Sequence, residues 1–330
     1  MRLAMIGDVM LGRGVAAGIG YRSPESFWGT TLPLLREADL ALANLECVIT
    51  THTTPWNHPP RVFHFRTPPE GVEILRAAGV RLVSLANNHT LDFGEPGLLD
   101  TLRALDAAEI AHAGAGIDLA EARRPALVEA GGLRVGLIAF TDNVPEWAAT
   151  PEKAGVHHIA IHPDAETLGM VEQAVARARA AGAQFVIFSL HWGPNMRLRP
   201  PESFRQFVHG ALDRGVDLVY GHSAHVFQGV EVYKGKPILY DTGDFLDDYA
   251  TDPLLRNDQS LIFFAEIEGT QVTALRMVPV HLKYSEVDLA VNPELEEICA
   301  RLIALSREMG THVARHGNTL HVHLASGPKT

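Results

Sequence analysis

Short apolar runs recur along most of the chain, and amphipathic segments separate them. The runs are nearly continuous rather than alternating, which is typical of strands covered on both faces. We expect strands at residues 3–8, 40–45, 82–86, 111–114, 133–140, 185–190, 218–220 and 238–240. Apolar residues spaced three and four apart predict helices at residues 69–78, 96–107, 164–181 and 201–214. This alternation of strands and helices predicts an α/β fold with a core sheet.

The pattern changes in the last quarter of the chain. Alternating residues on both sides of a Glu-Gly-Thr turn predict an antiparallel hairpin there, followed by an amphipathic helix and a final edge strand. These elements are expected at residues 260–283, 293–309 and 320–324. Because no repeat or low-complexity linker interrupts the sequence, we expect a single domain over residues 1–330, with its motifs in roughly the first 250 residues.

Several predicted strands end in a short group of polar residues. In open α/β sheets, ligands bind outside the carboxyl ends of the strands, so these groups are expected to converge. Each residue alone also has a structural interpretation, such as a turn aspartate or asparagine. Together they offer carboxylate, imidazole and amide oxygen, which is the donor set of a two-metal hydrolytic site. The candidate residues are Asp8, Glu46, Asn88, His89, His191, His222 and His225.

Composition narrows the classes of function. A formal net charge of −11 argues against a protein that binds nucleic acid electrostatically. The 17 histidines favour a metal site, whereas two cysteines exclude a disulfide scaffold and a four-cysteine zinc site. The chain opens on a short strand pattern rather than a signal peptide, and it contains no apolar stretch long enough to span a membrane. We therefore expect a cytoplasmic protein without a membrane span.

The motifs at the strand ends resemble those of a known family. The segments that carry the resemblance are Gly7-Asp8-Val9-Met10-Leu11-Gly12-Arg13, Asn44-Leu45-Glu46, Leu85-Ala86-Asn87-Asn88-His89, Gly221-His222-Ser223-Ala224-His225 and Ile238-Leu239-Tyr240-Asp241-Thr242-Gly243-Asp244-Phe245. In this order they are similar to the motifs of CapA proteins, which are named for capsule or poly-γ-glutamate synthesis. That family is similar to calcineurin-like metallophosphoesterases.

The resemblance implies a four-layer αββα sandwich and a site for two divalent metal ions, either Mn, Fe or Zn. Asp8 would bind one ion, Glu46 would take the place of the bridging aspartate, and Asn88 would bind the second ion through its amide oxygen. His89 would protonate the leaving group. The imidazole ligands implied are His191, His222 and His225.

Two positions depart from the phosphoesterase pattern. Met10 stands where a ligand histidine is usual, and Arg13 nearby offers a charged group for a phosphate or carboxylate instead. Ser223 stands where many relatives have a histidine, so either His222 or Ser223 faces the metal.

Three other residues near these motifs have two interpretations each. Asp92 either holds His89 in one tautomer or caps the following helix. Asp244 either orients a ligand histidine or is a turn residue. Arg61 either meets an anionic substrate or is a solvated surface residue, and the surface role is favoured.

The motifs are compatible with more than one function. Two divalent ions outweigh the charge of Asp8 and Glu46, which favours an anionic small molecule or poly-γ-glutamate as the partner. The first hypothesis is a metal-dependent hydrolase of a phosphoester or related anionic substrate. The alternatives are an accessory protein of poly-γ-glutamate or capsule synthesis, and a non-catalytic binding module, which Met10 and Ser223 would favour.

Overall fold

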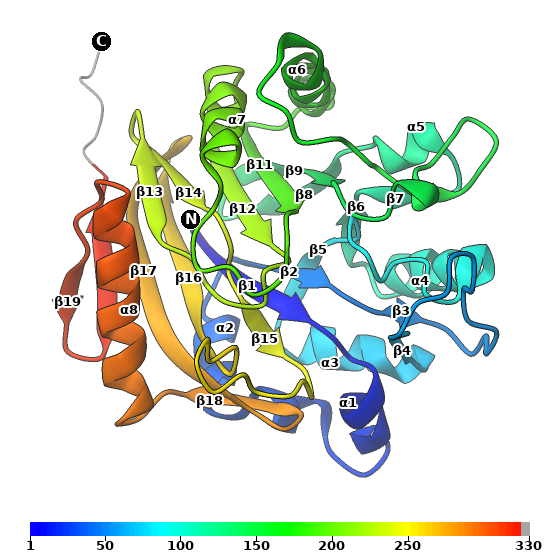
Figure 1. Ribbon diagram of the computed structural model, residues 1–330, viewed down its shortest axis with the longest axis horizontal. Helices are drawn as coiled ribbons and strands as arrows, with labels where there is room; N and C mark the ends of the chain where they lie inside the picture. Colours follow the sequence, from blue (N-terminus) through cyan, green and yellow to red (C-terminus); the bar gives the residue numbers. More distant parts are fainter. Residues whose placement is uncertain (325–330) are drawn as a thin grey trace.

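A computed structural model of the protein describes residues 1–324 and has four layers, with two β-sheets lying between helices (Figure 1). The first sheet has the strand order β19-β20-β17-β16-β1-β2-β5-β6, with β15 paired to β1 and β18 paired to β17. The second sheet has the order β13-β14-β12-β11-β9-β8. The predicted α/β class and its αββα layering are confirmed.

The elements are distributed over these layers as follows. The first sheet consists of β1 (Arg2–Val9), β2 (Leu40–Leu45), β5 (Val80–Ser84), β6 (Ala111–Ala113), β15 (Asp244–Leu246), β16 (Gln259–Glu268), β17 (Gln271–Lys283), β18 (Glu286–Leu289), β19 (Ala314–His316) and β20 (Thr319–His323). The second sheet consists of β8 (Ala126–Ala130), β9 (Leu133–Thr141), β11 (Phe185–His191), β12 (Leu218–His222), β13 (Val230–Tyr233) and β14 (Lys236–Leu239). The α-helices are α1 (Arg13–Gly18), α2 (Leu32–Arg36), α3 (Val72–Ala77), α4 (Gly94–Ala107), α5 (Leu119–Ala122), α6 (Ala165–Ala180), α7 (Glu202–Asp213) and α8 (Glu294–Glu308).

Short elements complete the described chain. Two further pairs of strands join β3 (Val48–Ile49) to β4 (Arg66–Thr67) and β7 (Ala115–Gly116) to β10 (Gly155–Val156). The 3-10 helices are η1 (Pro24–Thr31), η2 (Pro69–Gly71) and η3 (Pro145–Trp147). No helix within residues 1–324 combines the length and apolar content that a membrane crossing requires.

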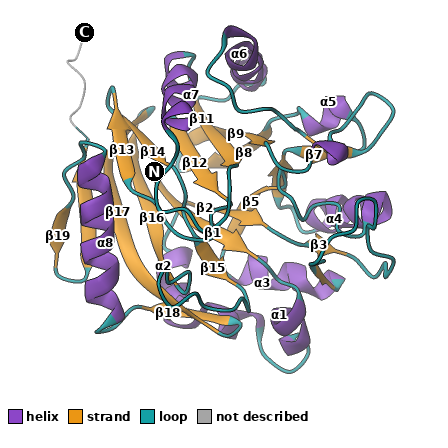
Figure 2. Ribbon diagram, in the orientation of Figure 1, coloured by secondary structure: helices purple, strands orange, loops and turns teal. Residues whose placement is uncertain are grey.

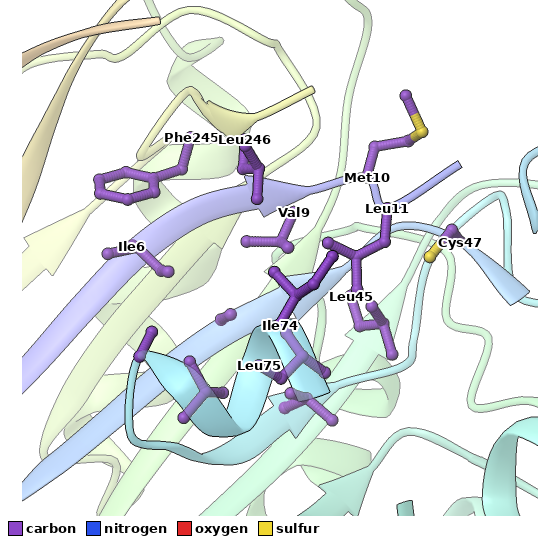
Figure 3. Packing of buried hydrophobic residues seen from close by; sticks show 14 of the residues in the cluster. Ile6, Val9, Met10, Leu11, Leu45, Cys47, Ile74, Leu75, Phe245 and Leu246 are labelled. Atoms are coloured by element: carbon purple, nitrogen blue, oxygen red, sulfur yellow. The ribbon is translucent and has the colours of Figure 1, made fainter. Parts of the chain in front are cut away.

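Alternate residues of each central strand serve two different cores. In β1, Leu3 and Met5 point between the sheets, whereas Ala4 and Ile6 point to the outer face. The outer core of the first sheet joins Ile6, Val9 and Leu45 to Ile74 and Leu75 of α3 (Figure 3). Helices α6 and α7 cover the outer face of the second sheet (Figure 2). Burial on both faces explains why these strands read as continuous apolar runs.

Parallel pairing aligns the ends of the strands. Strands β1, β2, β5 and β6 run parallel, as do β9, β11, β12 and β14. Asp8 of β1 is therefore paired with Asn44 of β2, and His191 of β11 with His222 of β12. The Tyr220 hydroxyl donates a hydrogen bond to the carbonyl of Ile6 and so links the two sheets near these ends.

Two sequence predictions about strands need correction. The third predicted strand ends at Ser84 rather than at residue 86, and the backbone NH of Leu85 instead bonds to Ala113. The expected final edge strand, β20, is an inner strand because β19 pairs along its other side. Strand β19 reads Ala-Arg-His and is largely exposed, so it carries no hydrophobic pattern that would predict it.

Candidate metal centre

Asp8 is placed by a close approach of two backbone segments. The Asp8 NH donates to the Gly243 carbonyl at 2.9 Å, and a Cβ at Gly7 would lie 1.7 Å from that same oxygen. Only glycine fits at position 7 for this reason. Asp8 itself is fully buried, and its Oδ1 accepts a hydrogen bond of 2.7 Å from the Asn44 amide.

Asp8 belongs to two groups of metal-ligating side chains. One group joins Asp8 to His191 and His222, and the other joins it to Glu46 and His225. Within each group, one donor atom per residue lies within 4.8 Å of the others. The donor side chains thus come together from β1, β11 and β12 and from the segments that follow β2 and β12. This agrees with the convergence expected for residues at the carboxyl ends of strands.

Individual distances connect the two groups. His191 Nδ1 lies 2.9 Å from His222 Nδ1, which is 3.9 Å from Asp8 Oδ1. His225 Nδ1 lies 3.6 Å from Asp8 Oδ2. Glu46 Oε1 lies 3.7 Å from His191 Nε2, so Glu46 reaches from its own group to the other one. The five side chains form a single cluster.

Burial disfavours the charged forms of most residues in this cluster. Burial, followed by the charge of Glu46, raises the pKa of Asp8 well above its usual range, and burial also raises the pKa of Glu46. Burial lowers the pKa of His222 to about 3, and burial together with the other histidines lowers the pKa of His191. Burial alone would lower the pKa of His225, but Asp244, Glu46 and Asp8 raise it well above normal.

The donor set fits divalent cations. Asp8 Oδ2, Glu46 Oε1 and Asn88 Oδ1 are buried acceptors without a hydrogen-bond donor among residues 1–324. Leaving buried oxygens unpaired costs free energy, and cations bound between them would offset that cost. Carboxylate, amide oxygen and neutral imidazole suit Mn, Fe or Zn.

Neighbouring side chains orient two of the histidines. Ser189 Oγ lies 2.8 Å from His222 Nε2, which leaves His222 Nδ1 facing the cluster. His225 Nδ1 lies 2.8 Å from Asp244 Oδ1, so of the two interpretations of Asp244 the structure supports the orienting one. His222 belongs to one of the donor groups, and its Nδ1 lies 3.9 Å from Asp8 Oδ1.

His89 and Asp92 form a buried pair beside the cluster. His89 Nδ1 lies 2.6 Å from Asp92 Oδ2, which also accepts a hydrogen bond of 2.7 Å from the Phe65 NH. Helix α4 begins after Phe93 and has no side-chain cap, so the capping interpretation of Asp92 is wrong. The imidazole is held with Nδ1 toward Asp92, and Nε2 has no hydrogen-bond partner among residues 1–324.

Met10 does not stand in for the missing histidine. Its side chain is fully buried in the apolar core of the first sheet (Figure 3), and its sulfur accepts a contact of 3.0 Å from the Gly12 NH. The donor set of this site therefore has one imidazole fewer than the phosphoesterase pattern implies.

Comparison with known proteins places this geometry in a family. A family model described as "Bacterial capsule synthesis protein PGA_cap" matches residues 2–249. The chain belongs to this family. The match confirms the resemblance to CapA drawn from the motifs and spans the same part of the sequence.

Two relatives of this PGA_cap protein illustrate the range of similarity. A "Probable polyglutamine synthesis accessory protein" of Mycobacterium tuberculosis is 34% identical over 305 residues, covering 89% of this chain and 80% of the relative. The "Capsule biosynthesis protein CapA" of Bacillus anthracis is 26% identical over 285 residues, covering 86% and 68%. The crystal structure of the calcineurin-like phosphoesterase YfkN from Bacillus subtilis is 11% identical, with a TM-score of 0.41 and 88% of each chain covered.

A pocket of about 590 Å³ opens over one side of the cluster in this PGA_cap protein. Its lining joins Asn88, His89 and His225 to Arg13, to residues of the loop at 61–65 and to residues of the segments at 195–196 and 249–257. Arg13 is partly exposed and is held by an ion pair of 3.2 Å with Asp248. The predicted residues Asn88, His89 and Arg13 are thus brought to one cavity.

Sequence reasoning missed several residues that shape the site. Asn44 bonds Asp8, and Asn87 donates to Asn44 at 3.1 Å, so both set the position of a carboxylate. The Tyr249 hydroxyl donates to Glu46 Oε2 at 3.1 Å. Arg61 lines the pocket with only 19% of its side chain exposed, which contradicts the favoured surface role. Asn44 was visible in its motif, whereas no local pattern indicated Tyr249.

Proposed function

We propose that this PGA_cap protein is a metal-dependent hydrolase acting on a phosphoester or a related anionic substrate, with two divalent ions of Mn, Fe or Zn. The observation that carries the proposal is the sharing of Asp8 between two donor groups beside one pocket. Two-metal hydrolases require ions close enough to hold one substrate between them, and a shared carboxylate supports that spacing.

The proposed ligands divide between the two ions. Asp8, Glu46 and His225 would hold one of them, and Asp8, Asn88, His191 and His222 the other. The contact between Glu46 and His191 supports Glu46 as a second bridging group, as the resemblance implies. When bound, the ions supply Lewis acidity and positive charge for an anionic substrate.

The protein's own residues would supply proton transfer and orientation. With Nδ1–H donated to Asp92, His89 presents Nε2 to the pocket and can protonate the leaving oxygen there. Asp92 fixes the orientation of the ring through this hydrogen bond. Arg13, which lines the same pocket, would bind an oxygen of the substrate anion.

A second candidate function is an accessory role in polymer synthesis. The names of the two relatives refer to polyglutamine synthesis and to capsule biosynthesis, and the description of the family refers to capsule synthesis. In this role the same pocket would bind or process poly-γ-glutamate. Saturable binding of short γ-glutamyl peptides in titration calorimetry would support it, and absence of binding would count against it.

Aryl phosphate hydrolysis tests the principal proposal. The Mn-, Fe- and Zn-loaded protein should release p-nitrophenol from its phosphate mono- or diester, and a chelator should abolish the activity. Asp8→Ala and His191→Ala should each lower kcat/KM by about 100-fold or more, because both remove proposed ligands. Asp217→Asn is the control, since Asp217 pairs with Arg179 and precedes β12, at the end away from His222. Hydrolysis that survives chelation or Asp8→Ala contradicts the proposal.

A further inference from the structure

The pocket over the metal centre has a strongly asymmetric charge. Its lining includes two arginines, Arg13 and Arg61, and the amides Asn195 and Asn257, but no carboxylate among the described residues. The protein as a whole carries a formal charge of −11, so a pocket wall free of carboxylates is contrary to the average composition. Such a pocket lining favours an anionic group on the ligand, in addition to the group that the metal centre would hold.

Arg61 is the less expected of the two arginines. Its guanidinium lies over the Trp147 ring, 4.6 Å from the centroid, and its Nε is buried without a hydrogen-bond acceptor among residues 1–324. The nearest carboxylate oxygen, Asp92 Oδ1, is 3.7 Å away, too far for a hydrogen bond and equally unpartnered. Burial lowers the pKa of Arg61, although Asp92 opposes this. A buried donor left unpaired is costly unless a ligand satisfies it.

The position of Arg61 along the pocket is also informative. The next residues, Val62 and Phe63, line the same pocket and are exposed, so they mark its mouth. His89 lines the same pocket but is buried, and both His89 and Arg61 lie within 4 Å of Asp92. Arg61 therefore lies between the metal centre and the solvent, where a group attached to a bound substrate would pass.

We infer that Arg61 forms a second anion subsite, so that the substrate carries two anionic groups, one held at the metal centre and one by the Arg61 guanidinium. This inference rests on the proposed function, because the metal centre must hold the first group. A planar guanidinium fixed by an aromatic ring pairs with the two oxygens of a carboxylate or phosphate. Substrates with a single anionic group would then bind more weakly.

The competing explanation is that Arg61 only supports Asp92 and hence His89. In that case removing Arg61 would slow the turnover of esters whose leaving group needs a proton from His89, whether the ester has one or two anionic groups. It would not change the preference between ligands with one and two anionic groups. The two explanations are therefore distinguished by the ratio of the affinities for ligands with two and with one anionic group, rather than by the activity.

Matched phosphonates measure that ratio on the Mn-loaded protein. Calorimetry compares 3-phosphonopropionate with propylphosphonate, which has the same length but ends in a methyl group. The carboxylated ligand should bind about tenfold more tightly to the wild type. Arg61→Met should bring the ratio near one, and Arg61→Lys should leave it intermediate. Arg66→Met is the control, because Arg66 lies nearby in sequence but contacts the carbonyls of Thr51 and His52.

The outcomes separate the inference from the proposed function. An unchanged preference in Arg61→Met, or equal weakening of both phosphonates, overturns the subsite. An equal affinity of the wild type for both ligands overturns it as well. If neither phosphonate binds the Mn-loaded wild type, the proposed function is contradicted and the inference falls with it. Thermal unfolding of each variant verifies that it is folded. If Arg61→Met is not folded, Arg61→Lys provides the test.

Discussion

A buried carboxylate needs a hydrogen-bond donor or a cation beside each oxygen. The candidate site contains two buried carboxylates that each have an oxygen without a donor. Asp8 and Glu46 are fully buried and each presents one oxygen without a donor among residues 1–324. Removing such groups from water is unfavourable unless a cation or a proton compensates them. Their pKa values, raised chiefly by burial, express this requirement. The residues that are costly for folding are thus the ones suited to metal binding.

The proposed role of His89 makes a prediction about leaving groups. His89→Ala should lower the hydrolysis rate of phenyl phosphate by about 100-fold, because the departing phenoxide needs a proton. The rate with 2,4-dinitrophenyl phosphate should fall much less, since that leaving group departs as a stable anion. The measurement is kcat for both esters with each variant.

A second histidine–aspartate pair provides the control for that experiment. His112 Nε2 lies 3.1 Å from Asp106 outside the pocket, so His112→Ala should alter neither rate selectively. An equal loss with both esters in His89→Ala would show that His89 does not protonate the leaving group.

At the scale of single residues, sequence could identify donors but not their contacts. Asp8, Glu46 and His191 were recognisable because each lies in the last residues of a strand or directly after it, which fixes the edge of the sheet that it reaches. Arg61 lies in a loop, and its burial depends on Trp147, which is distant in sequence. The orientation of His222 likewise depends on Ser189 in the neighbouring strand.

At the scale of elements, the carboxylate of Asp288 links β18 to η1. Asp288 accepts hydrogen bonds from the NH and hydroxyl of Thr30 and from Lys283. Burial alone would raise the pKa of Asp288, but these partners outweigh it and hold the pKa at about 2. The interaction therefore stabilises the fold above the unfolded pKa of about 4 and is lost as the pH falls toward 2.

This linkage gives a prediction about pH and stability. Asp288→Asn should lower the free energy of unfolding by about 1 kcal/mol at pH 7, a value reduced by partial solvent screening. The difference from wild type should shrink as the pH falls from about 4 toward 2. Denaturant unfolding across this range measures it. Glu268→Gln is the control and should change little, because Glu268 is exposed at the end of β16. A difference that is independent of pH would contradict the assignment.

A strong hydrophobic pattern predicted the boundaries of some elements closely. Strand β2 and the predicted run at residues 40–45 coincide, and α4 begins within two residues of its prediction. Strand β19 and the short β15 could not be found, because pairing with neighbours rather than local pattern forms them. The place of β20 inside the sheet followed from β19 and was missed for the same reason.

At the scale of the whole molecule, two sheets facing each other bring distant strand ends together. Asp8 and Glu46 come from the first sheet, and His191 and His222 from the second, so the cluster forms only when both are assembled. We propose that the described chain is one domain, which is supported by the pairing of β16 with β1 in the motif-bearing sheet. The positions of the polar residues at the ends of predicted strands indicated that these residues converge. The prediction of two sheets packed against each other rested on the family resemblance.

Metal stoichiometry tests the two-ion centre most directly. Protein reconstituted with Mn, dialysed and analysed by inductively coupled plasma mass spectrometry should retain about two ions per chain, and Asp217→Asn should retain the same. Asp8→Asn should lose at least one ion, because Asp8 belongs to both donor groups. Less than one ion per wild-type chain, or a content unchanged in Asp8→Asn, would contradict the two-metal centre.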